Sequence, residues 1–117
     1  RHRPDLLIVG EIRDKLTAQA VLRASLTGYT VFSTVHAASV RGVIQRLSEL
    51  GLSHWEIKNA LSSVVYQRLI AGKGELDIAK NEFESWSSEN WNKKIDQLLT
   101  NGYLTPTEAK REKIKTD

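Results

Sequence analysis

The stretch PDLLIVGEIRD, residues 4–14, decides the fold. Its apolar run LLIV, residues 6–9, has no polar alternation, a pattern typical of a strand covered on both faces in a parallel sheet. The residues that follow this strand are Gly10 and the charged Glu11, Arg13 and Asp14. Because open α/β sheets bind their ligands at the carboxyl ends of the strands, we expect chemistry at this point.

A second strand is expected one helix later. Apolar residues recur at helical spacing after the charged turn, at Leu16, Ala20, Val21 and Ala24, and Gly28 suits the end of that helix. Residues 29–35 are rich in β-branched and aromatic side chains and predict a strand that leads to Thr34 and His36. A strand, a helix and a strand in this order form a crossover in a parallel sheet. The sequence therefore predicts an α/β fold in which Glu11 and His36 line one cleft.

The rest of the chain predicts helices and a short hairpin. Helices are expected over residues 39–51, from Ser53 through Val65, over residues 87–102 and from Thr105 onward. Short strands are expected at residues 67–71 and 75–79, with a turn at residues 72–74. Trp55, Trp86 and Trp91 fall at helix starts or on apolar faces, so we expect core packing and not stacking on bases.

Composition limits the classes of function. The 117 residues contain no Cys and no Met and carry a formal net charge of +3. Without Cys there is no disulfide framework and no thiolate zinc site, and no apolar run approaches the ~20 residues that span a bilayer. Basic residues are interleaved with acids, so no direct nucleic-acid partner is expected. The start at Arg1 without Met predicts a fragment of a longer chain, and the fragment lacks a GxxxxGK[ST] phosphate loop.

Two segments resemble the secretion or traffic ATPases that power type II secretion, type IV pilus assembly and competence pseudopili. In RHRPDLLIVGEIRD, the residues that match the Walker B segment of that family are Arg1, Pro4, Asp5 and residues 9–14. In TGYTVFSTVHA, the residues that match its histidine box are Thr27, Gly28, Ser33, Thr34 and His36. Further matches are Gly42, Arg46, Leu47, Gly51 and residues 67–69. The resemblance covers roughly the first two thirds of the chain.

This resemblance implies the C-terminal part of a RecA-like P-loop ATPase domain in residues 1–80, with parallel strands and flanking helices. A small helical appendage would follow in residues 81–117. The implied catalytic residue is Glu11, whose carboxylate would polarise the attacking water. The implied nucleotide-binding residues are Gly10, Arg13, Thr34 and His36. The cofactors of the longer protein would be ATP and Mg²⁺, and no metal ligand is expected in this chain.

The resemblance also implies partners and a location. The longer protein would be a cytoplasmic motor at the inner face of the cell membrane, nearest to the branch that serves competence pseudopili in Gram-positive bacteria. It would form a homo-oligomeric ring, expected to be a hexamer, and act on a polytopic membrane platform protein. A rival hypothesis is a non-catalytic lobe that docks a partner through its C-terminal helices, and a weaker one is a nucleic-acid-binding domain.

Each candidate residue has a structural alternative. Glu11 can form a strand-end ion pair with Arg13, which lies two residues on and therefore on the same side of an extended segment. Asp14 can cap the helix that follows it. His36 can be a satisfied histidine at a strand end. The residues alone do not choose between these alternatives and a nucleotide site.

Overall fold

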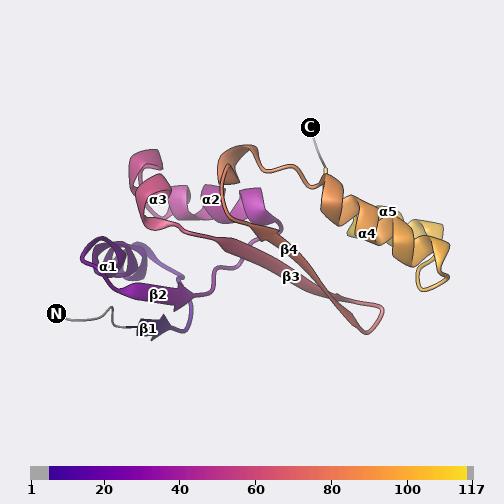
Figure 1. The fold of residues 1–117 in the computed structure, drawn as a ribbon, viewed down its shortest axis with the longest axis horizontal. Helices are drawn as coiled ribbons and strands as arrows, with labels where there is room; N and C mark the ends of the chain where they lie inside the picture. Colours follow the sequence, from indigo (N-terminus) through magenta and orange to yellow (C-terminus); the bar gives the residue numbers. More distant parts are fainter. Residues whose placement is uncertain (1–5, 116–117) are drawn as a thin grey trace. The chain divides into compact units, whose positions relative to one another are not determined.

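The computed structural model describes residues 6–115. The first elements are β1 (Leu6–Val9), α1 (Lys15–Leu26), β2 (Thr30–Ser33), α2 (Val40–Glu49) and α3 (His54–Ala60). They are followed by β3 (Val64–Ile70), β4 (Lys73–Ala79), the 3-10 turn η1 (Phe83–Ser85), α4 (Glu89–Thr100) and α5 (Pro106–Glu112) (Figure 1). The described chain divides into two compact units between Ser62 and Ser63. This mixture of helices and strands agrees with the predicted α/β class.

The first unit is built on a β-α-β crossover. β1 pairs in parallel with β2, with Leu6 opposite Thr30 and Val9 opposite Ser33. Helix α1 connects the two strands and contacts β2, and α3 contacts both α1 and α2. The Ser25 hydroxyl donates to the Ala60 carbonyl at 3.2 Å, which joins the ends of α1 and α3. The predicted strand, helix and strand are therefore confirmed, although β2 is shorter than residues 29–35.

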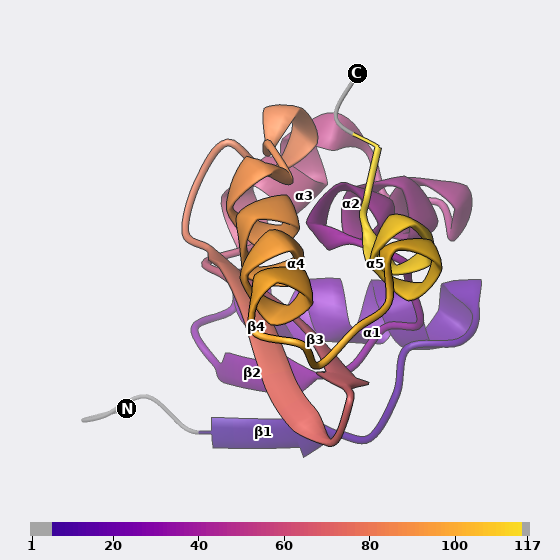
Figure 2. The same ribbon diagram turned by 90° about the vertical axis from the view of Figure 1, so that its right-hand side faces the viewer.

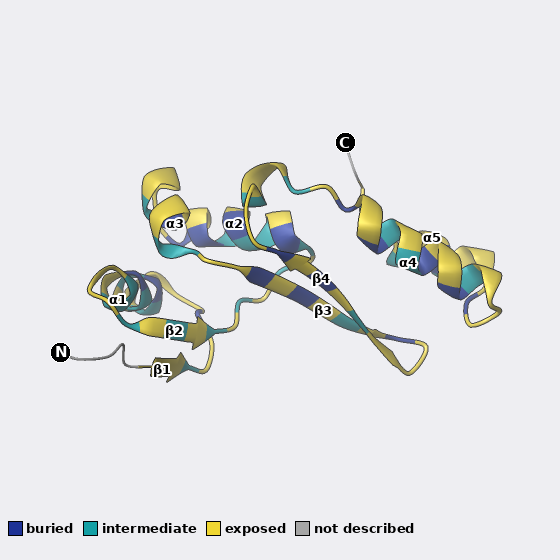
Figure 3. Cartoon of the chain, viewed as in Figure 1, coloured by how far each residue is buried: buried dark blue, intermediate teal, exposed yellow. Residues whose placement is uncertain are grey.

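The expected burial of the first strand on both faces is wrong for the described residues. Leu6 and Ile8 are 54% and 77% exposed, and Phe32 of β2 is 61% exposed (Figure 3). The reason is the small size of this sheet, in which β1 has β2 as its only strand neighbour among the described residues. An uninterrupted apolar run is typical of a strand whose two faces are both buried. In the described residues, the side chains of β1 are buried only in part.

The helix predicted through Val65 ends earlier, and a strand takes its last residues. α3 ends at Ala60, and β3 begins at Val64. Alternate residues of β3 are buried on one face, namely Val64, Tyr66 and Ile70, whereas Val65 and Leu69 are exposed. This period of two belongs to a strand and not to a helix. The β-branched Val64 and Val65 also favour the strand, so both strands of the hairpin are longer than predicted.

The second unit packs α4 and α5 with the β3–β4 hairpin. α4 contacts both α5 and β4 (Figure 2). Trp91 and Ile95 of α4 are fully buried, and the Trp91 ring meets the Tyr66 ring of β3 edge-on at 5.0 Å. The core role expected for Trp91 is confirmed. Trp55 is 66% exposed, which contradicts the same expectation, because the short helix α3 buries Ile57 instead.

Most predicted helix caps are confirmed. Ser39 accepts a hydrogen bond from the Gly42 N–H at 3.0 Å and begins α2. Capping boxes begin α3 and α5, formed by the pairs Ser53 with Glu56 and Thr105 with Glu108. At α4 the cap position is Ser88, but the Ser87 hydroxyl accepts from the Glu89 N–H at 3.2 Å. Caps depend on residues three apart in the sequence, so a sequence pattern is sufficient to identify them.

The domain boundary predicted between residues 80 and 81 stays a prediction. The structure groups the hairpin with α4 and α5 in the second compact unit, which starts at Ser63.

Within residues 6–115, none of the helices has both the length and the apolar character needed to cross a membrane.

Candidate functional site

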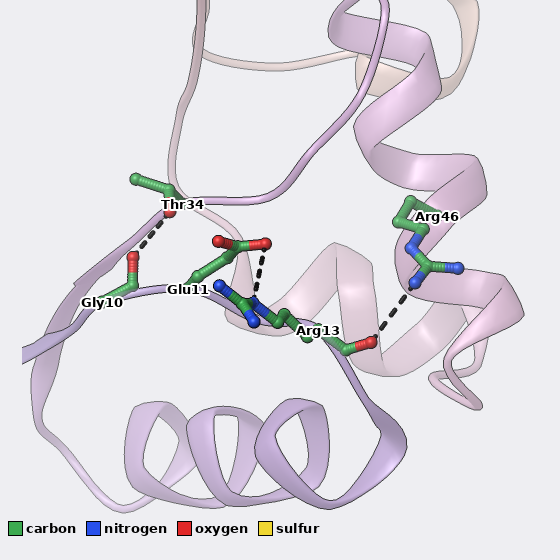
Figure 4. A network of polar contacts seen from close by, with 5 residues as sticks. All are labelled: Gly10, Glu11, Arg13, Thr34 and Arg46. Carbon is green, nitrogen blue, oxygen red and sulfur yellow. Dashed lines mark hydrogen bonds and ion pairs between the residues drawn. The ribbon is translucent and has the colours of Figure 1, made fainter.

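The candidate site lies where β1 and β2 end. Because the two strands are parallel, the loop 10–14 and Thr34 meet at the same edge of the sheet. The Thr34 hydroxyl donates to the Gly10 carbonyl at 2.6 Å (Figure 4). The Ile12 N–H donates to the Thr34 carbonyl at 2.8 Å. Ile12 is also buried. Thr34 therefore fixes the residue before and the residue after Glu11.

The carboxylate of Glu11 is accessible and paired with Arg13. Arg13 Nε lies 3.3 Å from Glu11 Oε2, and the side chains of Glu11 and Arg13 are 40% and 77% exposed. An ion pair this exposed contributes at most about 1 kcal/mol, so the two side chains can separate at little cost. The strand-end ion pair considered as an alternative is thus present, and it leaves the carboxylate free to take part in chemistry.

Arg46, for which the sequence predicted no site role, also contacts the loop of this site. Arg46 Nη2 donates to the Arg13 carbonyl at 3.2 Å (Figure 4). Arg46 Nη1 lies 3.5 Å from Glu49 Oε1. Arg46 matched the family pattern, which was the one signal available. An arginine followed three residues later by a glutamate on a helix otherwise indicates a surface ion pair.

His36 and Gly10 lie at the same edge with open surroundings. His36 follows the end of β2 by three residues and is exposed, and its imidazole has no hydrogen-bond partner among residues 6–115. Within the described residues, the imidazole is therefore not satisfied in the way that the structural alternative requires. A Cβ atom added at Gly10 would meet nothing within 4 Å, so the described residues give no steric reason for glycine there.

Asp14 is used as a helix cap. Its Oδ1 accepts a hydrogen bond from the Thr17 N–H at 2.8 Å, at the start of α1. This backbone hydrogen bond is the main cause that holds the pKa of the Asp14 carboxyl below its ordinary value. The structural alternative for Asp14 is confirmed, so Glu11 is the acidic residue of this loop that does not cap a helix.

These residues fit one side of a site for ATP and Mg²⁺. An accessible carboxylate, an open imidazole and a threonine hydroxyl are groups that can orient a water molecule. The phosphate-binding side does not fit, because no GxxxxGK[ST] loop occurs in the 117 residues. In the part of the chain that the structure describes, no cluster of three or more His, Asp or Glu side chains is placed to hold a metal ion.

Known proteins of one family are similar to this chain. The model of the family "Type II/IV secretion system protein" matches residues 1–100. Competence protein ComGA of Streptococcus pneumoniae is 57% identical over 114 residues, which are 97% of this chain and 36% of that protein. The putative type II secretion system protein E of Escherichia coli is 43% identical over 70 residues, 60% of this chain and 14% of that protein. The chain thus spans 36% or less of the length of these relatives.

Two solved structures share the fold. The ATPase DotB of Yersinia pseudotuberculosis matches with a TM-score of 0.69 and 20% sequence identity, over 93% of this chain and 37% of that one. The ATPase DotB of Legionella pneumophila matches with a TM-score of 0.66 and 20% identity, over 93% and 38% of the two chains. The predicted α/β fold class is confirmed by this likeness.

Proposed function

The chain belongs to the type II/IV secretion system protein family, and we propose that it is the C-terminal part of a cytoplasmic ATPase motor that assembles a competence pseudopilus. The support for the branch is the 57% identity with a competence protein. The activity, the cofactors ATP and Mg²⁺ and the partners belong to the longer protein, because this chain spans about a third of that relative.

The observation that carries the proposal is the position of Glu11. Its neighbours Gly10 and Ile12 are both hydrogen-bonded to Thr34, while its carboxylate stays accessible at the end of a parallel strand. ATP with Mg²⁺ supplies a γ-phosphoryl group that water attacks, and this reaction depends mainly on positioning and electrostatics. Glu11 orients that water and accepts its proton at the carboxylate.

The neighbouring residues have supporting roles in this proposal. Arg13 exchanges its exposed ion pair with Glu11 for an anionic oxygen, which the low energy of such pairs permits. The open imidazole of His36 donates or accepts one hydrogen bond toward the same place and senses its occupation. The open space beside Gly10 leaves room for water or a cation next to the strand end.

The proposal includes the assembly of the longer protein. A homo-oligomeric ring, a hexamer, completes each site with groups that this chain lacks, above all a phosphate loop. The ring acts on a polytopic membrane platform protein at the inner face of the membrane. Family membership supports these statements.

The test is Glu11→Gln in the full-length protein. The amide keeps the size of the side chain and loses the charge that polarises water, so the rate of ATP hydrolysis should fall by at least about a hundredfold. Nucleotide binding, measured by calorimetry, should stay near the wild-type value. Glu82→Gln is the matched control, because it makes the same change at an exposed side chain of the second unit.

Hydrolysis by Glu11→Gln within a few fold of the wild-type rate would place the general base elsewhere. If the full-length wild type neither binds nor hydrolyses ATP, the non-catalytic docking lobe becomes the better reading.

A further inference from the structure

The segment between Thr34 and Arg46 carries His36 and is hydrogen-bonded at both ends to the loop that carries Glu11. At one end, Thr34 holds Gly10 and Ile12. At the other end, Arg46 donates to the Arg13 carbonyl at 3.2 Å. All of these contacts lie in the first compact unit. The loop 10–14 therefore has fixed points before and after Glu11.

We propose that Arg46 is a positioning residue, which holds the Glu11 loop at a set place relative to α2. This inference rests on the proposed function of Glu11 as general base. Among the described residues, the Arg46 guanidinium contacts the Arg13 carbonyl and Glu49, and not the Glu11 side chain. It acts through the backbone alone.

The Arg13 carbonyl lies before the intrahelical hydrogen bonds of α1, so its partner comes from outside that helix. The first intrahelical bond of α1 runs from the Ala18 N–H to the Asp14 carbonyl at 3.0 Å, so the carbonyl of Arg13 lies just before the helix. Arg46 supplies that partner from α2. Its guanidinium presents donors in a rigid planar fork, and the Glu49 carboxylate at 3.5 Å orients the fork from the same helix.

The consequence is a loop with a fixed backbone and a movable side chain. The Arg13 side chain is 77% exposed and makes one weak ion pair, so it can leave Glu11 while its carbonyl stays bound to Arg46. A displacement of α2, whose first residue lies four positions after His36, would move the Arg13 carbonyl and with it Glu11. Arg46 thereby couples the histidine segment to the carboxylate.

The experiment compares Arg46→Gln, Glu49→Gln and Arg23→Gln in the full-length protein. Arg23 is the matched control, because it is exposed on α1 and its guanidinium has no partner among the described residues. Hydrogen exchange should become about tenfold faster at the amides of residues 10–14 in Arg46→Gln, as expected for the loss of one hydrogen bond to a charged group. The kcat for ATP should fall about ten- to a hundredfold with KM within about twofold, because the carboxylate is misplaced and nucleotide binding is not.

Glu49→Gln should change both measurements in the same direction by a smaller factor, and Arg23→Gln should change neither. Unchanged exchange at residues 10–14 in Arg46→Gln would overturn the proposal, and so would faster exchange with wild-type kcat. Should Arg46→Gln fail to fold, Glu49→Gln decides by the same two criteria. Glu11→Gln is measured alongside: if that variant is active, the proposed function fails, while the exchange data still decide whether Arg46 holds the loop.

Discussion

Thr34 fixes the loop after β1 with two of its atoms. Its hydroxyl and its carbonyl bond residues on either side of Glu11, so a single residue sets both backbone neighbours of the candidate base. Neither bond follows from the nature of the residue. Threonine at a strand end is ordinary, and only the parallel pairing of β1 with β2 brings it beside Gly10.

Asp14 makes the stability of this unit dependent on pH. The Thr17 N–H lowers the pKa of the Asp14 carboxyl in the folded chain. A lowered folded pKa gives a stabilisation that is present above the unfolded pKa, near pH 4, and is lost as the pH falls through the folded value. The melting temperature of the wild type should therefore fall more steeply below about pH 4 than that of Asp14→Asn.

Asparagine is a matched replacement, because it caps helices as well as aspartate does but does not titrate. Asp14→Ala loses both the cap and the charge and should melt lower at every pH. The comparison is a set of melting curves from about pH 3 to about pH 7, a range that includes the ordinary pKa of an aspartate carboxyl. Parallel curves for wild type and Asp14→Asn would show that the cap hydrogen bond does not depend on ionisation.

At the scale of elements, the β3–β4 hairpin is closed by two residues in left-handed conformations. Ala71 has φ 52° and Gly72 has φ 78°, and Ile70 pairs with Lys73 across them. A two-residue turn with both φ values positive matches the twist of the strands and normally carries Asn or Asp before Gly. Ala71 has a Cβ atom that disfavours a positive φ, and it lacks the polar side chain with which Asn or Asp stabilises this conformation. The backbone is therefore strained at this position.

Ala71→Asn should relieve the strain and raise the free energy of unfolding by about 0.5–1 kcal/mol. Gly72→Ala should lower it by about 1 kcal/mol, because it puts a Cβ atom in the same region although nothing else is close to it. Urea unfolding followed by tryptophan fluorescence measures both. An Ala71→Asn variant no more stable than the wild type would contradict the turn geometry.

The elements that were predicted well depend on neighbours in the sequence. The caps at Ser53 and Thr105 use partners three residues away, and the β-α-β order follows from apolar spacing. The end of α3 was missed, because Val64 and Val65 also fit the apolar face of a helix. Their pairing with Ala79 and Ile78 decides for a strand, and that pairing is not visible in the local pattern.

At the scale of the whole molecule, long-range contacts explain what the sequence did not predict. The edge that carries Glu11 and His36 was predicted from the parallel crossover. The role of Arg46 was not, because its bond to the Arg13 carbonyl joins residues 33 positions apart. The second unit also contains contacts that the local sequence does not predict. Arg68, which matches the family pattern, pairs with Glu112 at 3.5 Å and lies over the Trp91 ring.

The end of the described chain is held by such contacts. The Trp91 indole donates to the Glu112 carbonyl at 3.0 Å, and the Asn92 amide exchanges two hydrogen bonds of 2.8 Å with the backbone of Ile114. Lys113 lies 2.6 Å from Asp96. These contacts fix residues 112–114 along α4.

The division of the site between this chain and the rest of the protein gives the last prediction. The 117 residues contain Glu11, whose carboxylate is proposed to orient water, but the residues that bind triphosphate in P-loop enzymes, the backbone amides and lysine of GxxxxGK[ST], are not in the sequence. Arg13 and His36 alone offer exposed groups in water, where single charges interact weakly. The chain by itself should therefore neither bind Mg-ATP with useful affinity nor hydrolyse it. Titration calorimetry of the chain with Mg-ATP should show no heat beyond dilution, while the full-length protein should bind. A dissociation constant in the micromolar range for the chain alone would mean that the sheet edge around Glu11 binds the nucleotide without a phosphate loop. It would contradict the proposed division of the nucleotide site between this chain and the rest of the longer protein.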